Sequence, residues 1–352
     1  MLKKEYLYGF DDVSIEPYYM SEIESRKDIE DINHLLYTAP MDTVIGDMAS
    51  LDKFYEAGVN TIMVRGFWKT HLIDEIKYPH RVSLTLDEFE DFVNQKDCPL
   101  MTYLDAYKDK FWEYIILVDV ANGHMKRLYT LSEKCKDKYG PSVDLMVGNI
   151  ANPMTYQMYG KIEVDSIRLS IGTGSACLTS SKTAIHYPAI SLIDECKRIK
   201  NTMGLKTKII MDGGIRDSSD IIKAFAAGAD GVMMGSMFNK CVESSGQKLF
   251  ENSRQKINNE KAKTHYKTSG VLVKYRGMST NEVQQKERGD HKNYEEGLVK
   301  FNTVKYTIDE LMYELNYSIK SAFSYCYAND LDLFYRNAVL HLVTPSRKHN
   351  TL

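Results

Sequence analysis

The segment TKIIMDGG (207–214) is followed by SSDIIKAFAAGA (218–229) and then by DGVMMGSM (230–237). The first and last of these segments are apolar on consecutive positions, which is typical of strands that are buried on both faces of a parallel sheet. The middle segment has apolar residues at three- and four-residue spacing and ends at a glycine, as a helix does. The three segments together predict a strand, a crossover helix and a parallel strand.

The same alternation of short apolar runs with helical patterns extends toward the N-terminus. Six further runs are predicted to be strands: 35–44, 59–66, 99–106, 114–121, 143–150 and 165–172. Helical patterns lie between them at 48–58, 84–95, 124–140, 152–161 and 191–204, and another follows at 306–325. Eight strands at this spacing favour a (β/α)8 TIM barrel over an open doubly wound sheet.

The region after the eighth run is expected to extend the barrel. Residues 239–300 are polar and lysine-rich and are too long for a simple connection, so they predict a mobile lid or flap. The segment 306–325 is expected to supply the last barrel helix, and 326–352 to form a C-terminal tail. We therefore interpret residues 1–352 as a single barrel domain.

Composition excludes several other classes of protein. The chain has 352 residues, 43% of them hydrophobic, and a formal net charge of −3, so a nucleic-acid partner is not expected. It contains no apolar stretch long enough to cross a membrane and no apolar leader, and the predicted location is the cytoplasm. Its six cysteines form no metal-type spacing and are predicted to be reduced thiols.

Polar and glycine-rich residues follow the apolar runs, at the end where a (β/α)8 barrel carries its active site. Gly213 and Gly214 end the seventh run, and Gly235 and Ser236 end the eighth. Backbone N–H groups at these positions are free of side-chain obstruction, and loops at this point of the barrel commonly hold phosphate. The two loops together predict a phosphate cradle.

The loop IGTGSACLTS (171–180) places a thiol among small residues. One interpretation is a tight turn in which Cys177 is only another small residue. The alternative is a nucleophile, since a thiol near backbone N–H groups can be activated as a thiolate, with Thr179 as a proton relay. Two further features remain open at this point: Asp119 caps a strand or holds a ligand, and Glu295 and Glu296 are solvated charges or lid carboxylates.

Seven motifs in order carry a resemblance to a known family: APMDTV (39–44), ILVDVANGH (116–124), VGNI (147–150), IGTGSACLTS, MDGGIRD (211–217), AFAAGADGVMMGSM (224–237) and YRGMST (275–280). The set closely resembles the IMP dehydrogenase/GMP reductase family. DVANGH is similar to the reductase form, and the stretch after RGMST lacks the Arg-Tyr pair of the dehydrogenase flap. A regulatory CBS-type insert is also missing. The resemblance therefore implies the GMP reductase branch.

The resemblance implies a reaction and a homotetramer. Cys177 would attack C2 of the purine of GMP, ammonia would leave with help from Thr179 and Glu296, and a hydride from NADPH would release IMP. A monovalent cation, K+, would bind backbone carbonyls of Gly172, Gly174 and Cys177. The remaining implied residues bind substrate or cofactor: Ser175, Gly213, Gly214, Gly235 and Ser236 for the phosphate, Asp212 for the ribose, Gly277, Met278 and Ser279 for the base, and Asp119, Asn122 and Gly123 for the cofactor.

Two other functions remain as alternatives. The first is IMP dehydrogenase activity or a divergent purine-nucleotide substrate, and the second is a purine-nucleotide-binding protein without turnover. The chain departs from the family pattern at Leu178 and Ser180, where the family has Thr and Arg, and lacks the family's His-Lys pair after the second strand. Arg65 or Lys69 is the expected substitute near the cofactor.

Overall fold

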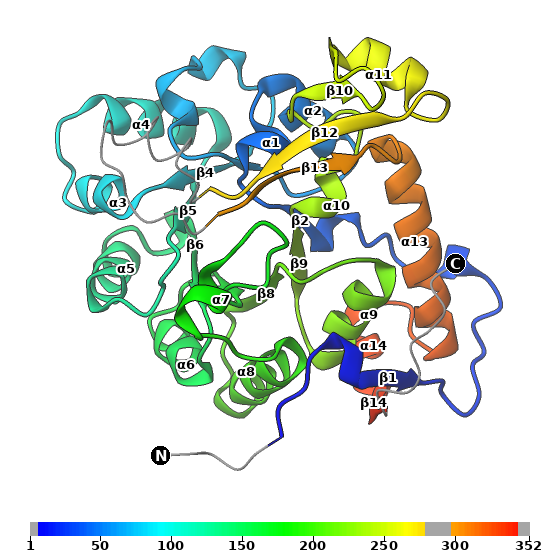
Figure 1. The fold of residues 1–352 in the computed structure, drawn as a ribbon. Helices are drawn as coiled ribbons and strands as arrows, with labels where there is room; N and C mark the ends of the chain where they lie inside the picture. The colour runs from blue at the N-terminus through cyan, green and yellow to red at the C-terminus, as the bar shows by residue number, and fades with distance from the viewer. Residues whose placement is uncertain (1–5, 279–296, 344–352) are drawn as a thin grey trace.

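The computed structural model describes residues 6–278 and 297–343. Its largest sheet has eight parallel strands in the order β2-β9-β8-β7-β6-β5-β4-β3. Figure 1 shows helices arranged around the outside of this sheet. The strands are β2 (Leu36–Thr38), β3 (Ile62–Met63), β4 (Arg81–Leu84), β5 (Tyr114–Asp119), β6 (Val143–Ile150), β7 (Ser166–Leu169), β8 (Lys208–Asp212) and β9 (Gly231–Met234).

The sheet closes on itself through Asn60, which precedes β3. Tyr37 of β2 forms a parallel bridge with Asn60, and the Asn60 N–H donates to the carbonyl of Leu36 at 2.9 Å. The barrel interior is filled by one cluster of side chains: Tyr37, Ala39, Ile62, Leu117, Met146, Ile210 and Met233. The predicted (β/α)8 barrel is therefore confirmed.

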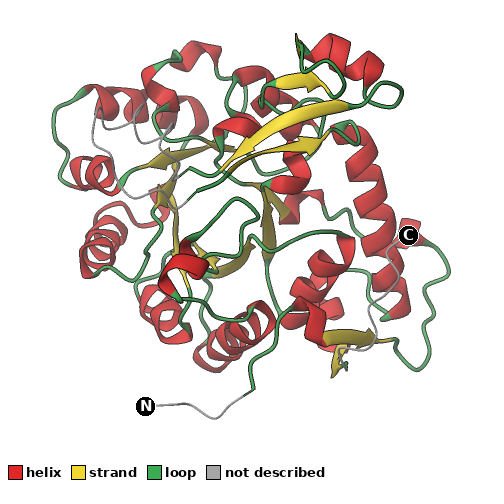
Figure 2. Ribbon diagram, in the orientation of Figure 1, coloured by secondary structure: helices red, strands yellow, loops and turns green. Residues whose placement is uncertain are grey.

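All the helices that cover the barrel except α4 were predicted from the sequence, and the apolar faces of the helices form the main core around the strands. Figure 2 shows them as a shell around the sheet. They are α2 (Met48–Glu56), α3 (Leu86–Val93), α4 (Pro99–Phe111), α5 (Lys126–Tyr139), α6 (Pro153–Lys161), α8 (Ala189–Met203), α9 (Ser218–Ala227) and α13 (Ile308–Tyr325). No helix within 6–278 and 297–343 is long and apolar enough to cross a membrane.

The prediction of a strand at 99–106 is wrong. This segment begins α4, with Pro99 in its first turn, and buries Leu100, Leu104 and Tyr107 on one face. Proline suits the first turn of a helix, and the spacing of the three buried residues is helical. The third barrel strand is β4. It was not predicted because it is short and contains the polar residues Arg81 and Ser83.

A second, antiparallel sheet occupies most of the region expected to be a lid. Its order is β11-β10-β12-β13, from β10 (Lys248–Phe250), β11 (Lys256–Ile257), β12 (Val271–Arg276) and β13 (Val299–Thr303), and α11 (Asn259–His265) accompanies it. Figure 1 shows this unit beside α1 (Asp42–Ile45) and α10 (Ser236–Asn239). Arg276 of β12 ties the small sheet to the barrel by donating from Nε to Asp42 Oδ1 at 3.1 Å.

The two ends of the described chain also pair with each other. β1 (Val13–Glu16) runs antiparallel to β14 (Val339–Leu342), with Val13 opposite Leu342. Between α13 and β14 lies α14 (Leu331–Asn337), whose Phe334 stacks on Phe323 of α13 with ring centroids 4.2 Å apart. The predicted tail at 326–352 thus packs on the barrel over its described part.

Candidate active site

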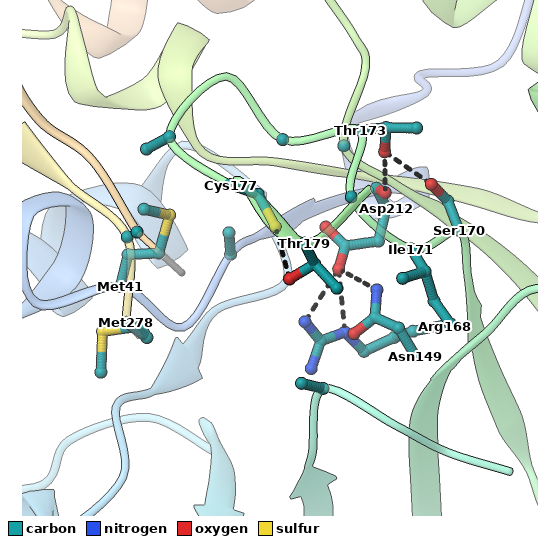
Figure 3. Close-up of a pocket in the computed structure, with 18 of the residues that line it drawn as sticks. Met41, Asn149, Arg168, Ser170, Ile171, Thr173, Cys177, Thr179, Asp212 and Met278 are labelled. Atoms are coloured by element: carbon teal, nitrogen blue, oxygen red, sulfur yellow. Dashed lines mark hydrogen bonds and ion pairs between the residues drawn. The ribbon is translucent and has the colours of Figure 1, made fainter. Parts of the chain in front are cut away.

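A cavity opens at the carboxyl ends of the barrel strands, with a volume of about 840 Å³ counting the part open to solvent. Its wall combines the thiol loop with residues from distant parts of the sequence. Among the lining residues are Met41, Asp119, Asn149, Arg168, Asp212, Tyr275, Gly277, Met278 and Gly297. Figure 3 shows Cys177 and Thr179 between Met41 and Met278 on one side and Asp212 on the other.

The thiol of Cys177 has a hydroxyl beside it. Its Sγ lies 3.3 Å from Thr179 Oγ1, at the start of the short helix α7 (Thr179–Thr183). Cys177 is half-buried, whereas Cys135, Cys196, Cys241 and Cys326 are buried, and all six cysteines are free. Among the cysteines, Cys177 therefore combines access to the cavity with a polar neighbour.

Gly297 and Leu298, which directly precede β13, lie against the loop that carries this thiol. Gly297 forms an antiparallel bridge with Cys177, and the Leu298 N–H donates to the Ala176 carbonyl at 2.9 Å. The Gly277 N–H in turn donates to the Leu298 carbonyl at 3.2 Å. Three stretches distant in sequence thus form one wall. Ser279, Glu295 and Glu296 lie outside the described residues.

A buried ion network forms the floor of the cavity. Arg168 of β7 donates from Nη1 to Asp119 Oδ1 at 2.6 Å and from Nη2 to Asp212 Oδ2 at 2.8 Å. Asn149 Nδ2 donates to the same Asp212 oxygen at 2.7 Å, as the dashed lines in Figure 3 show. All three charged side chains are mostly buried, at 7%, 13% and 14% exposure for Arg168, Asp119 and Asp212.

Asp119 is held from two sides, because Arg65 Nε also lies 3.5 Å from its Oδ2. Burial acts to raise the pKa of Asp119, but the positive charges of Arg168 and Arg65 outweigh it, so the pKa lies below its ordinary value. The same two carboxylates raise the pKa of Arg168 against the effect of burial. Asp119 and Arg168 therefore stay ionised at neutral pH.

Asp212 keeps one oxygen for a ligand. Its Oδ2 takes the bonds from Arg168 and Asn149, and in Figure 3 no dashed line reaches the second carboxylate oxygen. A carboxylate fixed in this way can accept hydrogen bonds from hydroxyl groups of a bound molecule. The arrangement suits the recognition of a sugar diol.

Of the residues expected at the phosphate, Gly235 lies beside Tyr275. A Cβ added at Gly235 would lie 2.8 Å from the Tyr275 hydroxyl, which donates to Met41 Sδ at 3.6 Å. Gly213 lines the cavity with φ at +83°, which glycine adopts without strain. Gly214 does not line the cavity, and Ser236 begins α10 beside Gly235.

The expected cofactor residues are not all on the cavity wall. Asp119 lines the cavity, but Asn122 and Gly123 do not. Gly123 is packed against β6: a Cβ there would lie 2.7 Å from the Asn149 carbonyl oxygen. His124 holds this loop by accepting from the Ala151 N–H through Nε2 at 3.0 Å. Gly123 thus permits close packing of the backbone.

Three residues on the cavity wall, Arg168, Asn149 and Tyr275, were not predicted from the sequence. The available signal for Arg168 was a charged residue inside an otherwise apolar predicted strand, because arginine is rarely buried unless it is paired. Within 6–278 and 297–343, no cluster of three His, Cys, Asp or Glu side chains could hold a metal ion.

Fold and site together define a (β/α)8 barrel protein. The thiol of Cys177 and the carboxylate of Asp212 line one cavity at the carboxyl ends of its strands. The family described as the IMP dehydrogenase / GMP reductase domain matches residues 110–350. The chain belongs to this family.

Individual relatives come from both branches. The chain is 32% identical to inosine-5'-monophosphate dehydrogenase of Chlorobaculum parvum over 223 residues, which is 63% of this chain and 44% of that protein. It is 31% identical to GMP reductase 1 of Homo sapiens over 239 residues, which is 67% of this chain and 63% of that protein. The matches thus span about half to two thirds of these relatives.

Proposed function

We propose that the protein is an oxidoreductase that converts GMP to IMP and ammonia with NADPH, in the manner of a GMP reductase. The observation that carries the proposal is the bridge between Gly297 and Cys177, which holds the residue following Glu296 against the thiol. A nucleophile, a hydroxyl and a carboxylate-bearing segment are then available at one place.

The proposed first step forms a bond between the Cys177 sulfur and C2 of the purine. The exocyclic amine leaves from C2 as ammonia, and Glu296 with Thr179 supplies the proton that this leaving group needs. The product is a thioimidate on Cys177. Covalent catalysis of this kind divides one difficult substitution into two easier steps.

The second step needs a hydride at C2, which a reduced nicotinamide supplies and no side chain can. With the C2–H bond formed, the sulfur leaves as the thiolate and IMP is released. The balance is GMP, NADPH and two protons giving IMP, NADP+ and ammonium. Asp119 is the residue on the cavity wall that fits the cofactor side, since its charge is fixed by Arg65 and Arg168.

The resemblance implies which residues would hold the substrate. Asp212 would accept from the ribose hydroxyls, Gly213, Gly214, Gly235, Ser236 and Ser175 would hold the phosphate together with Tyr275, and Gly277, Met278 and Ser279 would contact the base. We also propose a homotetramer, as the resemblance implies, and a location in the cytoplasm.

The dehydrogenase reaction is the competing proposal, because relatives of both kinds are similar at about the same identity. A dehydrogenase would need a base that activates water on the segment after Met278. Arg288 is the arginine in that segment, and the sequence places no tyrosine next to it. A protein that binds purine nucleotides without turnover is the third possibility.

One set of assays separates these functions. NADPH oxidation with GMP is measured beside NAD reduction with IMP, for the wild type and Cys177→Ala. We expect turnover with GMP that the variant lacks. Turnover only with IMP would establish the dehydrogenase, and nucleotide binding without either reaction would establish the binding protein.

The lid carboxylate is tested by two neighbouring variants. Glu296→Gln should lower kcat with GMP by about 10²–10⁴-fold, the usual contribution of a general acid. Glu295→Gln is the matched control and should stay close to the wild type. The reverse pattern would assign the role to Glu295.

A further inference from the structure

The carbonyl groups of the thiol loop accept hydrogen bonds from within the chain. Ser180 Oγ donates to the Gly172 carbonyl at 2.8 Å, and the Cys177 N–H donates to the Gly174 carbonyl at 2.8 Å. These are two of the three carbonyls expected to bind a monovalent cation. Both already have a donor.

One further carbonyl of the loop has a donor, since the Ala176 carbonyl accepts from the Leu298 N–H at 2.9 Å. The Leu178 and Ser180 carbonyls that follow accept the backbone bonds of helix α7, from Lys182 at 3.0 Å and Ala184 at 2.9 Å. Carbonyl dipoles brought together in a tight loop need positive partners, and here N–H and O–H groups provide them.

Ser180 packs directly against Gly172, close enough to hold this residue in position. Gly172 has φ at +77°, and a Cβ there would lie 2.5 Å from the Ser180 nitrogen and 2.3 Å from its Cβ. The start of α7 therefore rests directly on Gly172. A short side chain with a hydroxyl can reach the Gly172 carbonyl from this position.

We infer that the Ser180 hydroxyl fixes the thiol loop in place of a bound monovalent cation, so that this protein needs no potassium. Ser180 is a positioning residue that acts on Cys177 through the Gly172 carbonyl and touches neither substrate nor cofactor. The inference rests on the proposed function only in taking Cys177 as the reacting thiol. The expected potassium site and this arrangement use the same carbonyl oxygens of Gly172 and Gly174, and each hydrogen bond takes up one of the two lone pairs of its oxygen.

The test measures how fast iodoacetamide alkylates Cys177, followed by peptide mass spectrometry, in equal concentrations of potassium, lithium or tetramethylammonium chloride. The proteins are the wild type, Ser180→Ala and Ser181→Ala. Ser181 is the matched control, because its Oγ also donates to a loop carbonyl, that of Leu178, at 2.9 Å. The melting temperature is recorded in each salt.

For the wild type and Ser181→Ala we expect rates that agree in all three salts. For Ser180→Ala we expect about a fivefold difference between potassium and tetramethylammonium, the factor that corresponds to one typical net hydrogen bond. A wild type with such a dependence would overturn the inference. So would a Ser180→Ala protein that shows no cation dependence.

The wild-type measurement stands even if Ser180→Ala does not fold. Alkylation requires no turnover, so it also separates this inference from the proposed function. A protein inactive with GMP whose Cys177 reacts equally in all three salts refutes the reductase and supports the role of Ser180.

Discussion

Arg168 shows how one side chain can organise both ends of a cavity. Its guanidinium contacts Asp212, proposed to hold the ribose, and Asp119, proposed to lie near the cofactor. Charges taken out of water are tolerated only when they are paired and hydrogen-bonded. Removing the arginine leaves two buried carboxylates without their shared partner.

Arg168→Met should therefore lower the free energy of unfolding by about 3–5 kcal/mol, the usual cost of breaking a buried ion pair. Urea denaturation at pH 7 measures this change. Arg127→Met is the control, since Arg127 pairs with Asp87 at 2.7 Å but is 46% exposed, and its loss should cost much less. Equal losses in the two variants would contradict the role assigned to the network.

His80 predicts how stability depends on pH. Its ring is fully buried, Nδ1 lies 2.5 Å from Thr61 Oγ1, and burial lowers the pKa of His80 from 6.5 to about 4. Between these two pKa values the unfolded chain binds a proton that the folded chain does not. The contribution of His80 to the free energy of unfolding is fully present above pH 6.5 and is lost as the pH falls toward 4.

At pH 5 the loss from His80 should be about 2 kcal/mol relative to pH 7. Chemical denaturation at both pH values measures it. His80→Gln does not titrate in this range and should show a difference smaller by that amount. If both proteins lose the same stability, the buried histidine is not the cause.

Site residues could be predicted from the sequence where the interacting side chains lie close together along the chain. Cys177 and Thr179 are two residues apart, and their proximity follows from the loop itself. Arg168 and Asn149 act through partners on other strands, and no spacing along the chain reports such a contact. Gly123 was misleading for the opposite reason, because a glycine needed for close packing looks the same in sequence as one beside a ligand.

At the scale of single elements, capping explains where helices begin. Thr307 precedes α13, its Oγ1 accepts from the Glu310 N–H at 3.2 Å, and Glu310 Oε2 accepts from the Thr307 N–H at 2.9 Å. This reciprocal pair satisfies N–H groups that the helix itself cannot bond. It fixes the start of the last barrel helix.

Thr307→Ala should destabilise the protein by about 1 kcal/mol, as loss of an N-cap usually does. The midpoint of urea denaturation, with an unchanged slope, is the appropriate measurement. Thr307→Ser retains the hydroxyl and should stay within a few tenths of a kcal/mol of the wild type. A serine variant as unstable as the alanine variant would exclude the cap as the reason.

Seven of the eight barrel strands could be predicted because long apolar runs mark strands that are buried on both faces. β4 escaped because its four residues include Arg81, whose Nη2 reaches Asp144 at 2.6 Å. An arginine can lie in a buried strand when it is paired, but the sequence around Arg81 does not show that its partner, Asp144, lies on β6. The apolar run of α4 was mistaken for a strand because composition outweighed its four-residue spacing.

At the scale of the whole molecule, the pairing of β1 with β14 joins the two ends of the described chain. Lys223 of α9 donates to the Phe10 carbonyl at 2.9 Å, so the N-terminal segment also rests on the barrel. β1 has no partner strand other than β14 within the described residues. Its backbone protection should therefore depend on the C-terminal segment.

A chain that ends at Ala338 should lose amide protection at residues 13–16 while β8 stays protected. Hydrogen exchange followed by mass spectrometry resolves the two regions. A chain that ends at Val343 keeps β14 and serves as the control. Unchanged exchange at 13–16 in the shorter chain would show that the barrel alone orders β1.

The small sheet has a consequence for how catalytic specialisation can arise. Arg276 and Val299 are paired residues on β12 and β13, so the chain leaves this sheet and re-enters it at adjacent positions. A different stretch between Met278 and Gly297 would leave the contact of Leu298 with Ala176 of the thiol loop in place. We therefore expect that replacing residues 279–296 by the corresponding stretch of a dehydrogenase relative would change the proton chemistry proposed at Cys177 and leave the proposed phosphate-binding loops unchanged.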